Sequence, residues 1–308
     1  MIEVKGASRA GNVQKSIRRH QTGKRFYPFL MIIALFFIYP AVPYAEECRI
    51  LWFHPEQAPL IIKKGYGTGM GTIERMEAFF KAQLTGCLHH YENGNYERIL
   101  RMIKKKENAC CVPLYKTPER ERFIEFSIPY QIVLSNALII MESDRKKFKP
   151  FIGPDGKVAL EDLLAKGYRV GVAKGRIYRG VIDQTIDKYR NTPSLVEHDS
   201  SEQMIDSLMA MMENGRIDAL IAYPIEAQYV AKSIGMKALS LPIAGMDDYG
   251  LTSVGCSKTK AGKEIIKKLD ALILKYRTTP SFMDYTEHWL DPSALERHRT
   301  FTRKEFGD

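Results

Sequence analysis

Apolar residues occur along the chain with two alternating spacings. Short continuous apolar runs, typical of buried strands, alternate with stretches in which apolar residues recur every three or four positions, as in helices. Residues 50–53, 87–91 and 109–112 are the first three expected strands, and residues 73–84 and 96–103 are the helices between them. The order strand–helix–strand–helix–strand predicts a mostly parallel sheet covered by helices.

The alternation restarts in the second half of the chain, where the polar stretch 142–154 is the expected crossing between two lobes. Ser200 with Gln203 forms a capping box that predicts a helix start, and Asn214-Gly215 predicts the end of that helix. Two successive α/β units without a low-complexity linker favour two lobes over one large sheet. The later strands are expected at 138–141, 168–172, 218–222 and 251–256, and the later helices from Gly175, at 204–212 and, as the last one, at 265–276.

The charge of the chain is concentrated at its beginning. The 308 residues carry a formal charge of +10, but seven basic residues and only Glu3 precede residue 26. An apolar core at 29–38 follows, and the small residue Ala45 precedes Glu46-Glu47, which is the layout of a secretory signal peptide. Without residues 1–45 the net charge is +4, so we expect no nucleic-acid partner. An uncleaved N-terminal anchor is the alternative, because Pro43 is unfavourable next to the cleavage site.

The five cysteines suit an oxidising compartment. Cys48 and Cys87 begin two strands that should be parallel neighbours, so they are candidate disulfide partners. Cys110 and Cys111 are successive residues of a third strand, and at most one of them can face a given partner. One of the five thiols must stay unpaired within a monomer.

Motifs of metal and cofactor chemistry are missing from the sequence. The glycine cluster at 65–71 lacks the spacing of a dinucleotide- or phosphate-binding loop. His89 and His90 are adjacent on an expected strand, so their side chains point to opposite faces and cannot bind one metal ion together. No zinc or serine-hydrolase motif occurs. We therefore expect no metal and no cofactor, and we do not expect an enzyme.

Thr117 and Arg120 directly follow the third expected strand. Loops at the carboxyl ends of strands line the binding crevice of open α/β sheets. Thr117 can cap a short helix while Arg120 points to the crevice, where its planar guanidinium matches a carboxylate with two parallel hydrogen bonds. The alternative is a solvated arginine that pairs with Glu119 or Glu121.

The surrounding stretch resembles the signature of family 3 extracellular solute-binding proteins, the polar-amino-acid type with the type II periplasmic binding fold. Similar stretches occur in the order of the family from residue 48 to residue 290. The T-x-x-R…F-S-x-P-Y pattern of that signature matches at Thr117, Arg120, Phe126, Ser127, Pro129 and Tyr130.

This resemblance implies an α/β fold of two lobes, each a mostly parallel sheet flanked by helices, joined by two crossings and closing on a small ligand by hinge motion. Residues 48–143 together with 245–308 would form the first lobe, and residues 144–244 the second.

The resemblance also implies that Arg120 holds a ligand carboxylate. The second-lobe acid that holds the ammonium group in amino-acid binders is replaced by Tyr223, and the family's Gly-Thr-Thr becomes Gly175-Arg176-Ile177. We therefore expect an anionic or zwitterionic solute clamped by Arg120 and Arg176, with help from the backbone amides of a helix N-terminus. The expected ligand-binding residues are Trp52, His54, Gln57, Tyr115, Thr117, Arg120, Arg176 and Tyr223.

The expected function is that of a monomeric periplasmic binding protein that presents a small organic solute to an inner-membrane ABC permease. A second hypothesis is a ligand-sensing or accessory protein that serves a sensor partner and has no role in uptake. A third is an exported dehydratase-like enzyme on the same scaffold, which would need an acid or base such as Glu226, His54 or Glu74.

Overall fold

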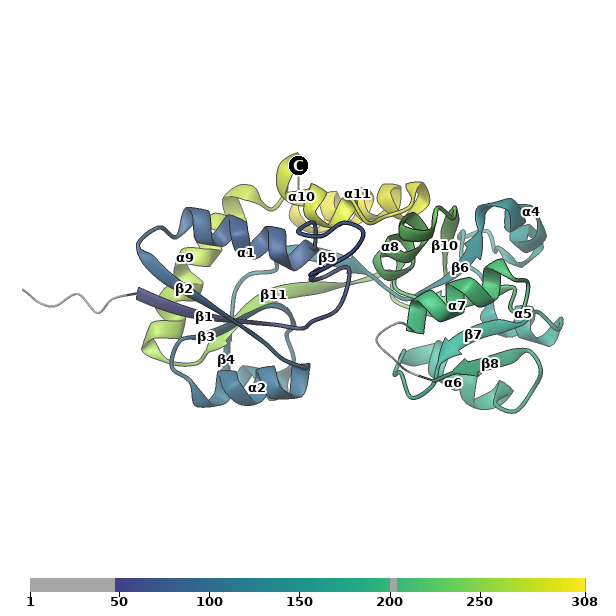
Figure 1. The fold of residues 1–308 in the computed structure, drawn as a ribbon, viewed down its shortest axis with the longest axis horizontal. Helices are drawn as coiled ribbons and strands as arrows, with labels where there is room; N and C mark the ends of the chain where they lie inside the picture. Colours follow the sequence, from purple (N-terminus) through teal and green to yellow (C-terminus); the bar gives the residue numbers. More distant parts are fainter. Residues whose placement is uncertain (1–47, 200–203, 308) are drawn as a thin grey trace, which may run out of the picture. The chain divides into compact units, whose positions relative to one another are not determined.

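The computed structural model describes residues 48–199 and 204–307. The expected leader at 1–45 and the capping box of Ser200 and Gln203 lie outside these residues. Residues Glu46–Asp308 form one compact unit built on two β-sheets (Figure 1). Within the described ranges, no helix has both the length and the apolar character that a membrane crossing requires.

The first sheet, with its helices, is lobe 1. Strand β1 pairs in parallel with β2 on one side and β3 on the other, while β11 runs antiparallel to β3 (Figure 1). Ile73, Met76 and Phe80 on one face of α1 are fully buried, as their spacing predicts. The elements are β1 (Cys48–His54), α1 (Thr72–Gln83), β2 (Cys87–Asn93), α2 (Tyr96–Lys105), β3 (Ala109–Tyr115), α3 (Pro118–Glu121), β4 (Ile124–Phe126), β5 (Gln131–Leu134), β11 (Tyr249–Ser257), α9 (Lys260–Tyr276) and α10 (Pro280–Glu287).

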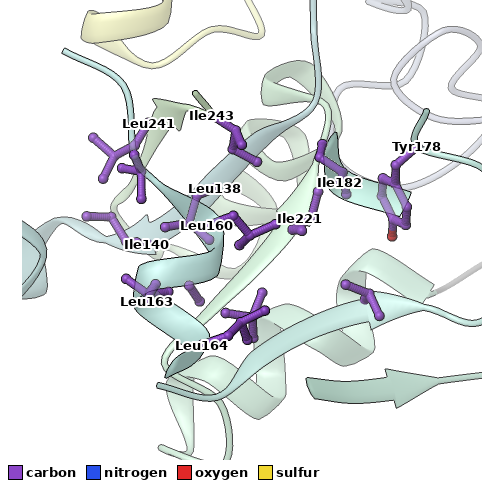
Figure 2. Close-up of a cluster of buried hydrophobic side chains, with 14 of the residues drawn as sticks. Leu138, Ile140, Leu160, Leu163, Leu164, Tyr178, Ile182, Ile221, Leu241 and Ile243 are labelled. Atoms are coloured by element: carbon purple, nitrogen blue, oxygen red, sulfur yellow. The ribbon is translucent and has the colours of Figure 1, made fainter. Parts of the chain in front are cut away.

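The second sheet, with its helices, is lobe 2, and its strands follow the order β10-β6-β9-β7-β8. Its core includes Leu138, Leu163 and Ile221, all fully buried (Figure 2). The elements are β6 (Ala137–Met141), η1 (Glu142–Asp144), α4 (Arg145–Phe148), η2 (Lys149–Phe151), α5 (Leu160–Ala165), β7 (Val170–Ala173), α6 (Gly180–Tyr189), β8 (Leu195–His198), α7 (Met204–Glu213), β9 (Ala219–Ala222), α8 (Pro224–Ile234) and β10 (Ala238–Pro242).

The first crossing between the lobes lies earlier than the expected stretch 142–154. Strand β6 pairs with β9 and β10 in the second sheet, so the chain leaves lobe 1 between β5 and β6, at Ser135-Asn136. Residues 142–151 form short helices within lobe 2. The apolar run of β6 would be buried in either sheet, so its composition does not reveal which sheet it joins.

Two further differences concern helices. The second-lobe helix expected from Gly175 begins only at Gly180, because residues 174–179 form a loop. The helix at 260–276 is also not the last one. It is followed by α10 and by α11 (Pro292–Phe306), which packs near β5 of the first sheet and near β10 of the second.

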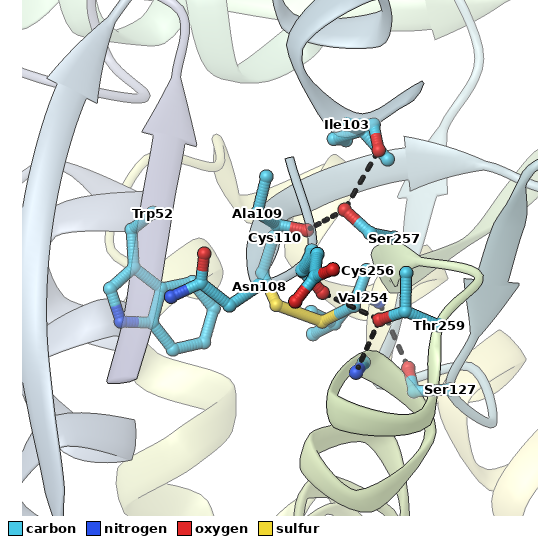
Figure 3. Close-up of a disulfide and its surroundings, with 12 residues drawn as sticks. Trp52, Ile103, Asn108, Ala109, Cys110, Ser127, Val254, Cys256, Ser257 and Thr259 are labelled. Carbon is cyan, nitrogen blue, oxygen red and sulfur yellow. Dashed lines mark hydrogen bonds between the residues drawn. A yellow bond between two sulfur atoms is a disulfide. The ribbon is translucent and has the colours of Figure 1, made fainter. Parts of the chain in front are cut away.

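Two disulfides fasten the first sheet. Cys48 and Cys87 are partners in the β1–β2 register and are bonded to each other, as expected from their places at the strand starts. Cys110 on β3 is bonded to Cys256 on β11 (Figure 3), a pairing that the sequence does not reveal. Cys111 is the buried free thiol.

Candidate functional site

A cavity of about 580 Å³ is lined by residues of both lobes. This volume lies within the range of about 300–1,000 Å³ that is usual for small-molecule sites. The carboxyl ends of β1 and β3 and the loops after them supply one side, as the position of binding crevices in α/β sheets predicts. Its charged lining residues are Arg120, Arg176 and Glu226, and His298 also lines it.

Arg120 is half-buried and is positioned by its own segment. Thr117 caps α3, since its hydroxyl accepts a hydrogen bond of 3.4 Å from the Arg120 amide. The guanidinium donates to the Tyr115 carbonyl oxygen at 2.8 Å, which fixes its direction. Among the described residues no carboxylate pairs with Arg120, and neither Glu119 nor Glu121 forms the ion pair that the alternative interpretation required.

Arg176 lies on the lobe 2 side of the cavity and is already paired. Its guanidinium donates to Glu226 at 2.9 Å and lies over the Tyr223 ring, 5.2 Å from the centroid. Burial lowers the pKa of Arg176, but the charge and hydrogen bond of Glu226 together with the neighbouring Tyr178 and Tyr223 outweigh burial and raise the pKa. The positive charge of Arg176 is therefore shared with a protein carboxylate.

Glu226 connects the two lobes. Its side chain is almost fully buried and also accepts a hydrogen bond of 2.9 Å from the Gln57 amide, which belongs to lobe 1. The Tyr223 backbone amide donates to the same carboxylate at 3.3 Å. A second-lobe carboxylate therefore lies at the cavity three residues after Tyr223, in the first turn of α8.

The cavity wall is mainly aromatic and aliphatic. Tyr96 and Tyr115 line it from lobe 1, and Ile177 and Tyr223 line it from lobe 2. Burial raises the pKa of both Tyr96 and Tyr115, so their hydroxyls remain protonated and can donate hydrogen bonds. This arrangement can enclose the apolar body of a solute around one charged group.

Five of the eight expected ligand-binding residues line the cavity, namely Gln57, Tyr115, Arg120, Arg176 and Tyr223. The other three do not. Thr117 acts as a helix cap, and Trp52 is buried in the lobe 1 core, where its indole N–H donates to His89. His54 is buried against Glu77, with 3.0 Å between Nδ1 and Oε2.

The expected helix N-terminus is also occupied. The amides of Tyr178 and Arg179, just before α6, donate to the Asp183 carboxylate at 2.9 and 2.7 Å. A side chain of the helix therefore already takes the place that an anionic ligand would need.

Two polar residues of the cavity were not predicted from the sequence. Thr72 at the start of α1 and His298 on α11 are both nearly fully buried, and the Thr72 hydroxyl and the His298 Nε2 have no hydrogen-bond partner in the described structure. Both line the cavity. Buried polar atoms without a partner are rare, and these two offer binding positions to a solute or to water. Within the same ranges, no group of His, Cys, Asp and Glu side chains is suited to a metal ion.

No protein-family model matches the sequence, and no curated protein matches it either. Solved structures do match. An ancestral cationic amino acid solute-binding protein has a TM-score of 0.56 at 16% identity, over 79% of this chain and 96% of the other. The second substrate-binding domain of Lactococcus lactis GlnP, in its open conformation, has a TM-score of 0.56 at 14% identity, over 80% and 96%.

The second substrate-binding domain of a putative amino acid ABC transporter from Streptococcus pneumoniae is similar over 79% of this chain and its entire own length, with a TM-score of 0.53 and 20% identity. The fold is that of two-lobed solute-binding proteins. Identities this low establish the fold alone. The periplasmic-binding-protein-like fold that the sequence resemblance implied is confirmed.

Proposed function

We propose that the protein is an exported solute-binding protein that captures a small carboxylate-bearing solute between its lobes and presents it to an inner-membrane ABC permease. The observation that carries this proposal is Arg120, a positioned guanidinium at a cavity of ligand size that has no carboxylate partner among the described residues. The fold supports the proposal, because the similar solved structures are named as a solute-binding protein and as substrate-binding domains.

The charges of the cavity favour a solute with one negative charge in excess. Arg176 and Glu226 balance each other at 2.9 Å, which leaves the charge of Arg120 uncompensated. A monocarboxylate would restore neutrality. An amino acid would also bring an ammonium group, which would have to share the Glu226 oxygens with Arg176 and Gln57.

Calorimetry with L-lactate, succinate, L-glutamate and L-arginine tests the proposal on the wild type, Arg120→Ala and Arg122→Ala. Arg122 is the matched control, since it is exposed, follows the same short helix and does not line the cavity. We expect at least one probe to bind. We expect Arg120→Ala to weaken it about tenfold or more, as loss of a charge-assisted hydrogen bond of about 1.5–3 kcal/mol requires.

Equal affinities for the wild type and Arg120→Ala would remove Arg120 from the site. Binding of none of the four probes, followed by binding of an uncharged solute, would overturn the carboxylate class. Site-specific crosslinking from exposed lobe residues in intact cells tests the interaction with a permease. We expect a crosslink to a membrane protein that forms only when the solute is present.

A further inference from the structure

One end of lobe 1 carries a dense group of exposed basic residues, which we call the basic end. It lies where β1, β2 and β3 begin and where β11 ends (Figure 1). Segments 101–108 and 258–268 meet there and contain nine basic but only two acidic residues, Glu107 and Glu264. The nine are all exposed: Arg101, Lys104, Lys105, Lys106, Lys258, Lys260, Lys263, Lys267 and Lys268.

The two segments are held together by hydrogen bonds from the end of β11. The Ser257 hydroxyl lies 2.7 Å from the Ile103 carbonyl oxygen and 3.2 Å from that of Ala109 (Figure 3). The Thr259 hydroxyl donates to the Glu107 carbonyl oxygen and caps α9 by accepting from Gly262. The basic end is therefore a fixed surface of the folded lobe and not a flexible tail.

The charges of the basic end are not neutralised within the part of the chain that the structure describes. None of the nine residues forms an ion pair, whereas Lys63, Lys147 and Lys188 elsewhere each pair with a carboxylate. The contacts of basic-end residues are to neutral groups. For example, Lys104 lies over the Phe123 ring and Lys258 donates to a backbone carbonyl oxygen.

The charge distribution is accordingly uneven. Segments 101–108 and 258–268 carry a net +7, while residues 46–308 as a whole carry only +4. The remainder of that unit is net negative. A surface of this kind attracts a flat or extended polyanion, and each Lys or Arg near an anionic lipid surface contributes about 1 kcal/mol.

The position of the basic end indicates which kind of polyanion it meets. The chain enters β1 at this end, where Cys48 is the first residue that the structure describes. The Lys268 Nζ lies 4.0 Å from the Cys48 Sγ. Residues 26–45, which are separated from Cys48 by Glu46 and Glu47, carry no charge and include the apolar run 29–38. A single apolar anchor and a polybasic surface are the two signals that together give stable membrane attachment.

We propose that the basic end lies against an anionic phospholipid surface. Lobe 1 would then contact the membrane through the basic end. The solute cavity lies at the opposite end of the strands and would face away from the membrane. A protein that retains its N-terminal apolar segment would make this membrane contact. A protein that has lost the segment would make the same contact with lower affinity. The proposal does not depend on the identity of the solute.

Vesicle flotation tests the proposal with protein purified in the form that the exporting cell produces. The vesicles contain either phosphatidylglycerol with phosphatidylcholine or phosphatidylcholine alone. The test variant replaces Lys105, Lys106, Lys263 and Lys267 with Gln. The control variant replaces four exposed lysines of lobe 2 with Gln and so has the same net charge; these are Lys146, Lys149, Lys166 and Lys237.

We expect the wild type and the control variant to float with phosphatidylglycerol vesicles in a salt-dependent manner, and the test variant to partition at least tenfold more weakly. Thermal melting of both variants checks that they fold. Equal losses in the two variants, or no preference of the wild type for phosphatidylglycerol, would overturn the proposal. A test variant that still binds vesicles but no longer binds single-stranded DNA would also overturn the proposal. That result would identify the basic end as a nucleic-acid surface.

Discussion

Glu226 determines how the charges of the cavity are shared. Its two oxygens accept hydrogen bonds from Arg176 and from Gln57, both at 2.9 Å. It balances the charge of Arg176, and it is the carboxylate with which an ammonium group of a zwitterionic solute would have to pair. A single carboxylate therefore decides whether the cavity is charged +1 or +2.

Replacing Glu226 with Gln should change which solutes the cavity prefers. The substitution keeps the side-chain size but frees the charge of Arg176, so a second solute carboxylate gains a charge-assisted partner. We expect the affinity for succinate relative to L-lactate to rise about tenfold in Glu226→Gln, measured by calorimetry. Glu119→Gln is the control, because Glu119 is exposed and does not line the cavity. An unchanged ratio would show that Arg176 does not contact the solute.

Individual site residues were predictable to different degrees. The position of Arg120 after the third strand predicts that it faces the crevice, and Arg120 does line the cavity. Trp52 and His54 were misplaced because β1 is buried on both faces, so alternation along the strand does not tell which side meets the crevice. His298 could not be found, because it comes from a helix far along the chain that has no counterpart in the sequence motif.

At the scale of elements, long and strongly periodic segments were predicted well and short ones were not. The helices around Ile73 and Ile99 and the strands between them lie where their patterns indicated. Strands β4 and β5 have three and four residues, too few for a period to be recognised. Helix α6 starts late because residues 174–179 form a loop whose last two amides bind Asp183.

Helices α10 and α11 are joined by a buried carboxylate. Glu287 at the end of α10 accepts from His298 at 3.3 Å and from both Arg299 nitrogens Nε and Nη2, the latter at 2.8 Å. Burial raises the pKa of Glu287, but the hydrogen bonds and charges of His298 and Arg299 outweigh it and lower the pKa to about 2. This contact holds His298 in place beside the cavity.

The lowered pKa predicts an acid-dependent loss of stability. A carboxyl group whose pKa is lower in the folded state stabilises the fold above its unfolded value of 4.5, and this contribution is lost as the pH falls towards about 2. We expect Glu287→Gln to lower the free energy of unfolding by about 2 kcal/mol at neutral pH. The difference from the wild type should shrink at low pH, as urea titrations at several pH values would measure. Glu296→Gln, exposed on α11, should follow the wild type.

At the scale of the whole molecule, the lobes are connected by the crossings of the chain and also by the packing of helix α11. Helix α11 packs near β5 and is bonded to β10 of lobe 2, since Arg297 donates to the Ser240 carbonyl oxygen at 3.0 Å. The resemblance to two-lobed proteins predicted the lobes themselves. It could not predict this third connection, because the apolar positions of α11 do not indicate which lobe they will contact.

The Cys110–Cys256 disulfide closes a loop that contains all of lobe 2. Its sequence separation is 146 residues, against 39 for Cys48–Cys87. Because a larger loop costs the unfolded chain more entropy, the two bonds should contribute about 5 and about 4 kcal/mol, respectively. We expect denaturant unfolding to show a loss about 1 kcal/mol larger for Cys110→Ala/Cys256→Ala than for Cys48→Ala/Cys87→Ala. The reverse order would show that loop size does not govern these bonds.

Because Cys110 and Cys111 are neighbours on β3, which of the two forms the disulfide indicates whether β3 has folded in the correct register. Cys110 points to the core layer of Trp52 and Cys256, whereas Cys111 points to the opposite layer with Phe53 and Ile99. Burial raises the pKa of the Cys111 thiol, which keeps it unreactive in the native protein. A slip of β3 by one residue would exchange the two thiols and would turn the other side chains of the strand to the wrong faces. Mapping which cysteine takes up an alkylating reagent after unfolding would therefore distinguish correctly matured molecules from misfolded ones.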